Sequence, residues 1–206
     1  MNPNVIQLIA AALAKIEARE IRMGSRTVTS GPTIGLGTST QVALFTGRPV
    51  HIPDEGDGSF KTELVIYDGP GGTIKINYWS KKDPRPDRHN HPWNDEDGVS
   101  FVSYILQGGY TETVEYVVDG ETRVEQRTYR AGDKNTAMWA EFHTVDEVLP
   151  DTVTLMICGP RYTPPEGKSH AWGYRIGNEF VPANAEKVAD PTFFPRFLAI
   201  NPHRRK

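Results

Sequence analysis

The feature that most constrains the fold of this 206-residue chain is a succession of short runs rich in β-branched and aromatic residues. Many of the runs alternate apolar and polar side chains with a period of two, and Asp-Gly, Gly-Gly and Pro punctuate them. The runs are QVALF (41–45), TELVIYDG (62–69), TIKINYW (73–79), VSFVSYIL (99–106), TETVEYVV (111–118), TRVEQRTYR (122–130), TVTLMIC (152–158) and AWGYRI (171–176). Many short strands, with no alternation between strands and helices, predict an all-β sandwich or barrel.

One pair of these runs is a predicted hairpin. In YVVDGETRV, Asp119 and Gly120 lie between two alternating segments. This dipeptide suits the tight turns that connect antiparallel strands. The two flanking segments are therefore expected to pair.

The chain is expected to be a single domain over residues 1–206, because no internal repeat and no linker divides it. The barrel is predicted over about residues 40–180. Residues 181–206 are expected to form an irregular tail, since prolines recur there and disfavour regular structure.

The N-terminal segment has two interpretations. VIQLIAAALA (5–14) is similar to the apolar part of a signal peptide, and its Ala-Leu-Ala at 12–14 mimics a cleavage site. However, no Lys or Arg precedes it, and apolar residues recur every three or four positions from Ile6 to Ile16. We therefore expect an amphipathic helix over residues 4–21 that packs on the outside of the barrel.

Composition and charge exclude several classes of partner. The formal net charge is −3 and the basic cluster is confined to the C-terminal end, so we expect no nucleic-acid partner. No apolar run approaches the roughly 18 residues that span a membrane, so we expect no membrane partner. Cys158 is the single cysteine, which rules out an intramolecular disulfide and favours a reducing, cytoplasmic location. A small-molecule substrate is the partner that remains.

Three histidines are candidates for metal ligands. His89 and His91 are two residues apart, so in a strand both would point to the same side of the sheet. His143 follows Gly132 by eleven residues, and the glycine would supply a turn before an inward-pointing histidine. Imidazole nitrogens are common ligands of divalent ions. The spacing therefore predicts a metal site inside the barrel.

The stretches around these histidines resemble the two sequence motifs of the cupin superfamily. The first stretch is similar to the H-x-H motif, and the second matches the spacing G-x5-P-x-G-x2-H-x3-N from Gly132 through His143. Met138, Ala140 and Glu147 stand in place of the proline, the second glycine and the asparagine. The resemblance covers about residues 60–176. It implies a jelly-roll barrel that holds a divalent metal.

The glutamate of the first cupin motif has two candidate positions. Counting forward from His91 places it at Glu96, whereas counting back from Gly108 places it at Phe101. We prefer the second count, because the strand must keep its register whereas a loop can lengthen. The predicted ligands are therefore the three histidines, with Glu96 or Asp95 as a fourth ligand if the acidic loop folds inward.

The three-histidine pattern is also similar to that of the cysteine dioxygenases and of uncharacterised cupins with H-x-H-P-W and W-G-[FY] signatures. INYWS (76–80) and SFVSYILQGGYTET (100–113) carry the first resemblance, with Ser100 where that family has a cross-linked cysteine. Thr154, Met156 and Cys158 occupy the places of its Ser-His-Tyr relay. The resemblance implies a three-histidine Fe(II) site without the thiol-specific relay.

Two functional hypotheses follow from such a site. Three neutral imidazoles leave a metal with its full charge and open positions, so an anionic chelating substrate and dioxygen can bind side by side. This favours a non-haem Fe(II) dioxygenase acting on a small organic acid or thiol. With Zn, Mn or Ni the same ligands favour an isomerase, a lyase or a cupin that only binds a small molecule.

Three further residues are candidates for contact with the substrate. Arg161 follows Gly-Pro at a strand end, where it could bind a carboxylate bidentately or form a surface ion pair. Tyr104 alternates with Ser103 along one strand, and the register decides which of them faces the interior. Trp172 lies near the expected mouth of the barrel, where it contacts substrate or packs in the core.

A homodimer is expected from the N-terminal part of the chain. Cupins commonly pair through strands contributed by this part, so the resemblance implies the same here. The amphipathic helix and the neighbouring QVALF segment offer a candidate surface.

Overall fold

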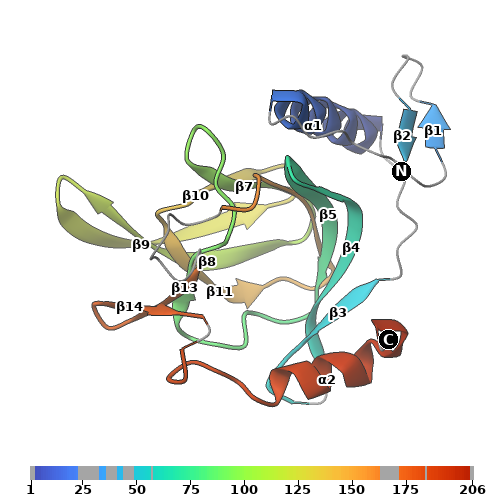
Figure 1. Ribbon diagram of the computed structural model, residues 1–206. Helices are drawn as coiled ribbons and strands as arrows, with labels where there is room; N and C mark the ends of the chain where they lie inside the picture. The colour runs from blue at the N-terminus through green and yellow to red at the C-terminus, as the bar shows by residue number, and fades with distance from the viewer. Residues whose placement is uncertain are drawn as a thin grey trace.

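The computed structural model describes residues 3–22, 33–35, 41–43, 49–56, 58–162, 172–183 and 185–204. In this part of the chain, two six-stranded antiparallel sheets form a barrel, and two short strands form a separate antiparallel pair (Figure 1). Aromatic side chains connect the two sheets, since the ring of Trp79 stacks on that of Tyr110 from the opposite sheet at 6.2 Å.

The elements follow the predicted runs closely. The first sheet has the order β10 (Lys134–Met138), β7 (Val99–Gln107), β12 (Thr152–Cys158), β5 (Gly72–Trp79), β4 (Ser59–Gly69) and β3 (Val50–Pro53). The second has the order β14 (Glu179–Pro182), β13 (Gly173–Ile176), β6 (Arg88–His89), β11 (Phe142–Val148), β8 (Gly109–Val118) and β9 (Glu121–Arg130). The remaining elements are α1 (Pro3–Arg22), the pair β1 (Thr33–Gly35) and β2 (Gln41–Ala43), α2 (Phe193–Ile200) and the 3-10 helix η1 (Pro202–Arg204).

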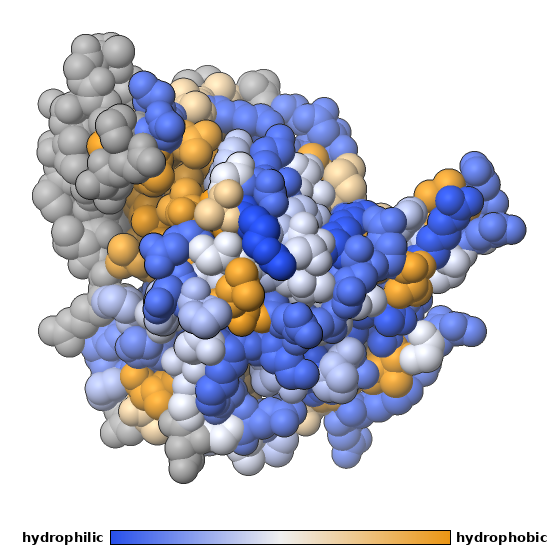
Figure 2. All heavy atoms as spheres, turned by 180° about the vertical axis from the view of Figure 1, so that it is seen from behind, coloured by the Kyte–Doolittle hydropathy of each residue, from blue (hydrophilic) through white to orange (hydrophobic). Residues whose placement is uncertain are grey.

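Helix α1 covers the outer face of the first sheet. Its apolar stripe packs against buried residues of β4, β5 and β12, in a cluster made of Val5, Ile9, Ala12, Leu13, Ile16, Ile66, Ile74 and Leu155. Seen from behind, apolar residues gather in the region of α1, whereas the projecting β8–β9 hairpin is largely hydrophilic (Figure 2). The predicted amphipathic helix packed outside the barrel is confirmed.

The end of α1 is fixed by the β4–β5 hairpin. Arg19 Nη1 donates to the carbonyl oxygen of Gly71 at 2.7 Å, and Glu20 Oε1 accepts from the Gly71 N–H at 3.0 Å. A Cβ at Gly71 would lie 2.8 Å from the Ile16 carbonyl oxygen, so only glycine allows this close approach.

Strand β7 shows which side chains face the interior. Phe101, Ser103 and Ile105 are buried inside the barrel, whereas Tyr104 packs against the cluster under α1. This is the register obtained by counting back from Gly108. The expected contact between Tyr104 and the substrate is wrong, because strand alternation places its side chain on the outer face of the sheet.

The predicted β8–β9 hairpin is confirmed. Val118 pairs with Glu121, and Asp119 and Gly120 have φ angles of 53° and 81°. Two consecutive positive φ angles are those of the turn that matches the twist of paired strands.

The expectation of an irregular C-terminal tail is wrong for residues 193–200, which form α2. Pro195 lies in the first turn, where a backbone N–H has no intrahelical partner, so the proline does not break the helix. Asn201 ties the end of α2 to β3, because its side-chain amide donates to the His51 carbonyl at 2.7 Å and accepts from the His51 N–H at 2.8 Å.

Two expectations concern contact with a membrane and pairing with a second copy of the chain. Among the described residues, no helix is both long and apolar enough to cross a membrane. Of the QVALF segment, residues 41–43 lie in the described part and pair with β1, whereas residues 44 and 45 lie outside it. The homodimer stays a prediction.

Candidate metal centre

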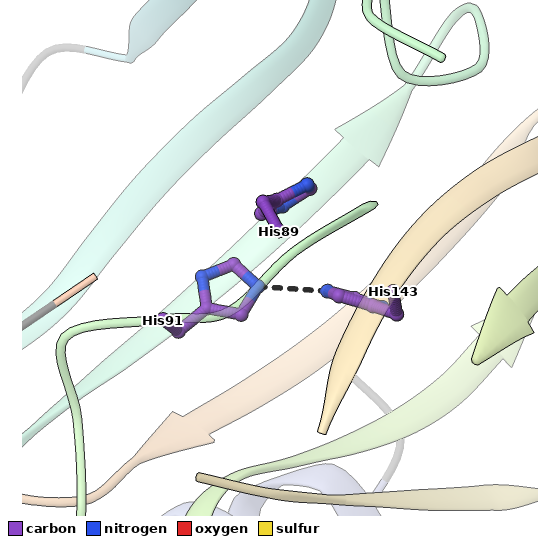
Figure 3. Close-up of side chains that lie close together, drawn as sticks. All are labelled: His89, His91 and His143. Carbon is purple, nitrogen blue, oxygen red and sulfur yellow. Dashed lines mark hydrogen bonds between the residues drawn. The ribbon is translucent and has the colours of Figure 1, made fainter. Parts of the chain in front are cut away.

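The three predicted histidines lie together inside the barrel (Figure 3). His89 is on β6 and pairs directly with His143 on β11, and His91 follows two residues after His89. The ring centroids are 5.0 to 5.1 Å apart, and one ring nitrogen from each residue lies within 4.8 Å of the others. Within the described part of the chain, this is the one group of three or more His, Cys, Asp or Glu with such geometry.

A carboxylate orients the ring of His143. Glu112 Oε2 lies 2.7 Å from His143 Nδ1, and His143 Nε2 lies 2.8 Å from His91 Nε2. Because a carboxylate accepts hydrogen bonds, it favours the tautomer with the proton on Nδ1. The lone pair of His143 Nε2 then points toward the other histidines, as a metal ligand requires.

A buried polar network holds Glu112 in place. The side-chain amide of Asn135 donates to Glu112 Oε1 and to the hydroxyl of Tyr110, both at 2.9 Å. The hydroxyl of Tyr129 donates to Asn135 Oδ1 at 3.1 Å. Burial raises the pKa of Tyr129 to about 12, so this hydroxyl keeps its proton at neutral pH. Sequence reasoning missed the network, although Tyr110 and Glu112 share the inward parity of β8.

Aromatic rings flank His91 on two sides. Trp93 stacks on it at 5.3 Å with an interplanar angle of 19°, and the ring of Phe101 meets it edge-on at 5.1 Å. Phe101 also lies 5.8 Å from the ring of His143. The position obtained by counting back from Gly108 therefore holds an apolar ring beside the histidines.

The acidic loop does not supply a fourth ligand. Glu96 is exposed in the turn after Asp95 and is outside the histidine group. Asp95 accepts from the N–H groups of Asp97 and Val99 at 3.0 and 2.8 Å, and its other oxygen lies 3.4 Å from Arg19 of α1. The expectation that Glu96 or Asp95 folds inward is wrong, because Asp95 closes its own loop and binds the helix.

The ring environments favour neutral ligands. Burial lowers the pKa of His89 to about 4. Burial, together with the neighbouring His89 and His143, lowers the pKa of His91 well below its ordinary value. Burial also opposes protonation of His143, but the charge and hydrogen bond of Glu112 outweigh it and raise the pKa. At neutral pH His89 and His91 are therefore neutral imidazoles, which is the form that binds a metal.

The donor set fits a divalent metal. Three imidazole nitrogens converge, a buried carboxylate stands behind His143, and apolar rings flank His91. Imidazole ligands suit Fe, Zn, Cu and Ni, so the ligand type alone does not select between Fe(II) and Zn.

A cavity of about 960 Å³ opens beside the histidines. His89 and His91 are on its wall, as are Arg161 and Trp172. Trp172 is 37% exposed, so it lies at the surface of the cavity and not in a packed core. The contacts of Arg161 and Trp172 with substrate stay predictions.

A second charged group, which sequence reasoning missed, lines the same cavity. Lys61 Nζ and Lys75 Nζ lie 3.0 and 2.8 Å from the same oxygen of Glu63. Burial alone would raise the pKa of Glu63, but the two lysines lower it to about 2. Burial likewise opposes the charge of Lys75, yet Glu63 raises the pKa of this ammonium group. Glu63 and Lys75 are therefore ionised at neutral pH.

Comparisons with known proteins concern the fold. No protein-family model and no curated protein matches the sequence. Solved structures that match include a recombinant oxalate oxidase in complex with glycolate, at 12% identity and a TM-score of 0.41 over 68% of this chain and 71% of that one. A variant of Bacillus subtilis oxalate decarboxylase matches at 20% identity and 0.40, over 66% of this chain and 34% of that one. An RmlC-like cupin from Shewanella frigidimarina matches at 19% and 0.32, over 57% and 86%.

Two antiparallel six-stranded sheets enclose the H-x-H pair and the later histidine, which is the arrangement predicted from the sequence motifs. The chain has a cupin fold. The predicted jelly-roll barrel with an N-terminal helix is thus confirmed. At such low identities and TM-scores, the matched structures transfer neither substrate nor reaction to this chain.

Proposed function

We propose that this cupin is a metal-dependent enzyme that binds a divalent cation through His89, His91 and His143 and acts on a small organic anion. The observation that carries the proposal is the convergence of one ring nitrogen from each histidine within 4.8 Å. Since the three ligands are neutral, the charge of the cation stays uncompensated and favours an anionic substrate. The adjoining cavity of about 960 Å³ has the size of a small-molecule site.

The reaction that we propose is a dioxygenation at Fe(II). Iron bound by the three histidines would supply redox chemistry with dioxygen. Around it, Glu112 holds the proton on His143 Nδ1, and the rings of Trp93 and Phe101 exclude water from the sides of His91. The sequence resemblance to the cysteine dioxygenases supports this reaction class.

An organic acid is favoured over a thiol as the substrate. The inner face of β12 carries Thr154, Met156 and Cys158, and Met156 lines the cavity. These side chains replace the relay that the thiol dioxygenases place there. Arg161 and Trp172 on the cavity wall are the proposed contacts for an entering anion.

A non-redox isomerase or lyase is the second candidate. The observation that favours it is the ionised group of Lys61, Glu63 and Lys75 in the same cavity, because charged side chains beside a Zn or Mn site stabilise developing charge.

The test combines metal analysis with oxygen uptake. The protein is purified anaerobically, its metal content is measured, and it is reconstituted separately with Fe(II), Zn, Mn and Ni. Oxygen consumption is then followed with a panel of small organic acids and thiols. Uptake by the Fe(II) form alone supports the dioxygenase, and turnover without uptake supports the second candidate. Wild-type protein that binds none of these metals refutes both.

A further inference from the structure

Lys61 and Lys75 share a single carboxylate, that of Glu63, so their positive charge is only partly neutralised. Both ammonium groups contact one carboxylate oxygen, at 3.0 and 2.8 Å. Two ammonium groups against one carboxylate leave a formal charge of one positive unit. The side chains of Lys61 and Lys75 are only 15% and 8% exposed, so water screens this charge weakly.

Carboxylates elsewhere on the cavity wall have other partners or are exposed. Asp54 pairs with Lys81, Asp190 pairs with Arg196, and Asp83 accepts from the N–H of Val145, whereas Glu55 is exposed at the rim. A buried charge is costly unless an opposite charge lies next to it. Glu63 is the carboxylate that pairs with Lys61 and Lys75 among the described residues. Their surplus charge therefore faces aromatic rings and the cavity, with no second carboxylate of the described residues against it.

This surplus charge lies close to the histidines. Lys75 Nζ lies 5.1 Å from the ring of Trp93, and the same ring stacks on His91 at 5.3 Å. Lys61, Lys75, His89 and His91 all line one cavity. One small molecule in that cavity can therefore meet both the ammonium groups and the histidines.

We propose that Lys61 and Lys75 form a carboxylate-binding subsite, so the substrate is a small organic acid with a second oxygen donor. Its carboxylate lies against the two ammonium groups while the other oxygen faces His89 and His91. This inference rests on the proposed function, since it names the substrate class of the same cavity. Arg161 is exposed on the cavity wall, so it meets the anion before the buried lysines do.

The subsite can be tested by binding, without turnover. Malonate, a dicarboxylate, and malonamide, its uncharged analogue, are titrated by calorimetry into full-length protein, both metal-loaded and stripped with chelator. At pH 8 His89 and His91, whose pKa values burial lowers, are neutral and do not attract the anion. The variants are K61Q and K75Q, and the matched control is K187Q, which removes an exposed lysine that pairs with Glu179.

Each cavity variant leaves one lysine paired with Glu63, so it removes the surplus charge without stranding the carboxylate. We expect K61Q and K75Q to bind malonate about 10- to 100-fold more weakly than wild type, because a charge-assisted hydrogen bond is lost. K187Q should bind as wild type does, and malonamide should bind all four proteins equally weakly. If K75Q fails to fold by circular dichroism, K61Q removes the same surplus charge and decides the question.

Two results overturn the inference: wild-type protein that binds malonate no more tightly than malonamide, or folded K61Q and K75Q that bind malonate as tightly as wild type. Failure of the subsite is distinguishable from failure of the proposed function. Stoichiometric metal with unchanged malonate binding in the variants would refute the subsite alone. Lysine-dependent malonate binding in protein that takes up no metal would refute the metal-dependent function alone.

Discussion

Replacing Glu112 with glutamine should weaken metal binding while leaving the barrel folded. Glu112 is 2% exposed and lies 2.7 Å from His143 Nδ1 and 2.9 Å from the amide of Asn135. Glutamine has nearly the same shape and keeps one oxygen acceptor, so the packing around it is preserved. It carries no negative charge, however, and its single oxygen cannot accept from both His143 Nδ1 and the Asn135 amide. It therefore favours the proton on His143 Nδ1 less strongly.

The expected loss follows from the role of this carboxylate behind a ligand. Partners of this kind change metal affinity by about 10- to 100-fold, or about 1.4 to 2.7 kcal/mol. We expect the upper half of this range, because the carboxylate is buried and the interaction is weakly screened. The pKa of His143 should also fall in the variant, since burial opposes its protonation and Glu112 supplies the attraction that raises the pKa.

The assay is competition for Zn²⁺ against a chromogenic chelator at pH 7.5, with circular dichroism to show that each variant is folded. The matched control is E147Q, which also removes one carboxylate but at an exposed position on the same strand as His143. E147Q should bind Zn²⁺ as wild type does. If folded E112Q binds Zn²⁺ with wild-type affinity, the orienting role that we assign to Glu112 is refuted.

Three other outcomes are expected. H143A should lose most bound metal by mass spectrometry yet keep its far-ultraviolet dichroism, because the apolar interior stabilises the barrel; full metal content would contradict the three-histidine site. Chelator-treated protein should lose stability to urea as the pH falls from about 6.5 toward 4. In this range His89 is protonated in the unfolded chain, whereas in the folded protein its pKa of about 4 keeps it neutral. The loss in free energy of unfolding that His89 alone can cause is at most on the order of 3 kcal/mol. His91 acts in the same direction, whereas His143, whose pKa is raised, partly opposes them. A constant urea midpoint over this pH range would argue against buried neutral histidines. Ile16 is 2% exposed, so I16A should lower the free energy of unfolding by about 2 to 5 kcal/mol in urea titrations. K15A, which changes the exposed neighbour Lys15, should change it little.

The predictions that held depend on local patterns. Alternation within a run identifies a strand, the apolar spacing from Ile6 to Ile16 identifies α1, and Asp119-Gly120 identifies a turn. The histidine group could also be predicted, because His89 and His91 are two residues apart and His143 follows Gly132 at the spacing of the second cupin motif. Each of these patterns can be recognised within a short segment or from the spacing of residues in a motif, without knowledge of which strands pair.

The predictions that failed depend on contacts between distant segments. The sequence of the acidic loop does not reveal that Asp95 binds Arg19 of α1, so the loop remained a candidate for a fourth ligand. Proline content alone predicted an irregular tail, yet Pro195 occupies a position where a helix tolerates it. Alternation along β7 does not by itself say whether Tyr104 or Ser103 faces the interior, so Tyr104 stayed a candidate for substrate contact until its packing under α1 was known.

The buried charges were the hardest features to predict, and they bear most directly on the substrate. Lys61 and Glu63 are on β4 and Lys75 is on β5, and only the pairing of these strands brings them onto one inner face. Glu112 and Asn135 likewise meet across the barrel from different sheets. A metal held by neutral histidines and a surplus ammonium charge in the same cavity are both positive, so an anion with two oxygen groups would compensate both. A thiol with a single carboxylate would leave one of them without an oxygen partner, which is why the interior charge favours an organic acid.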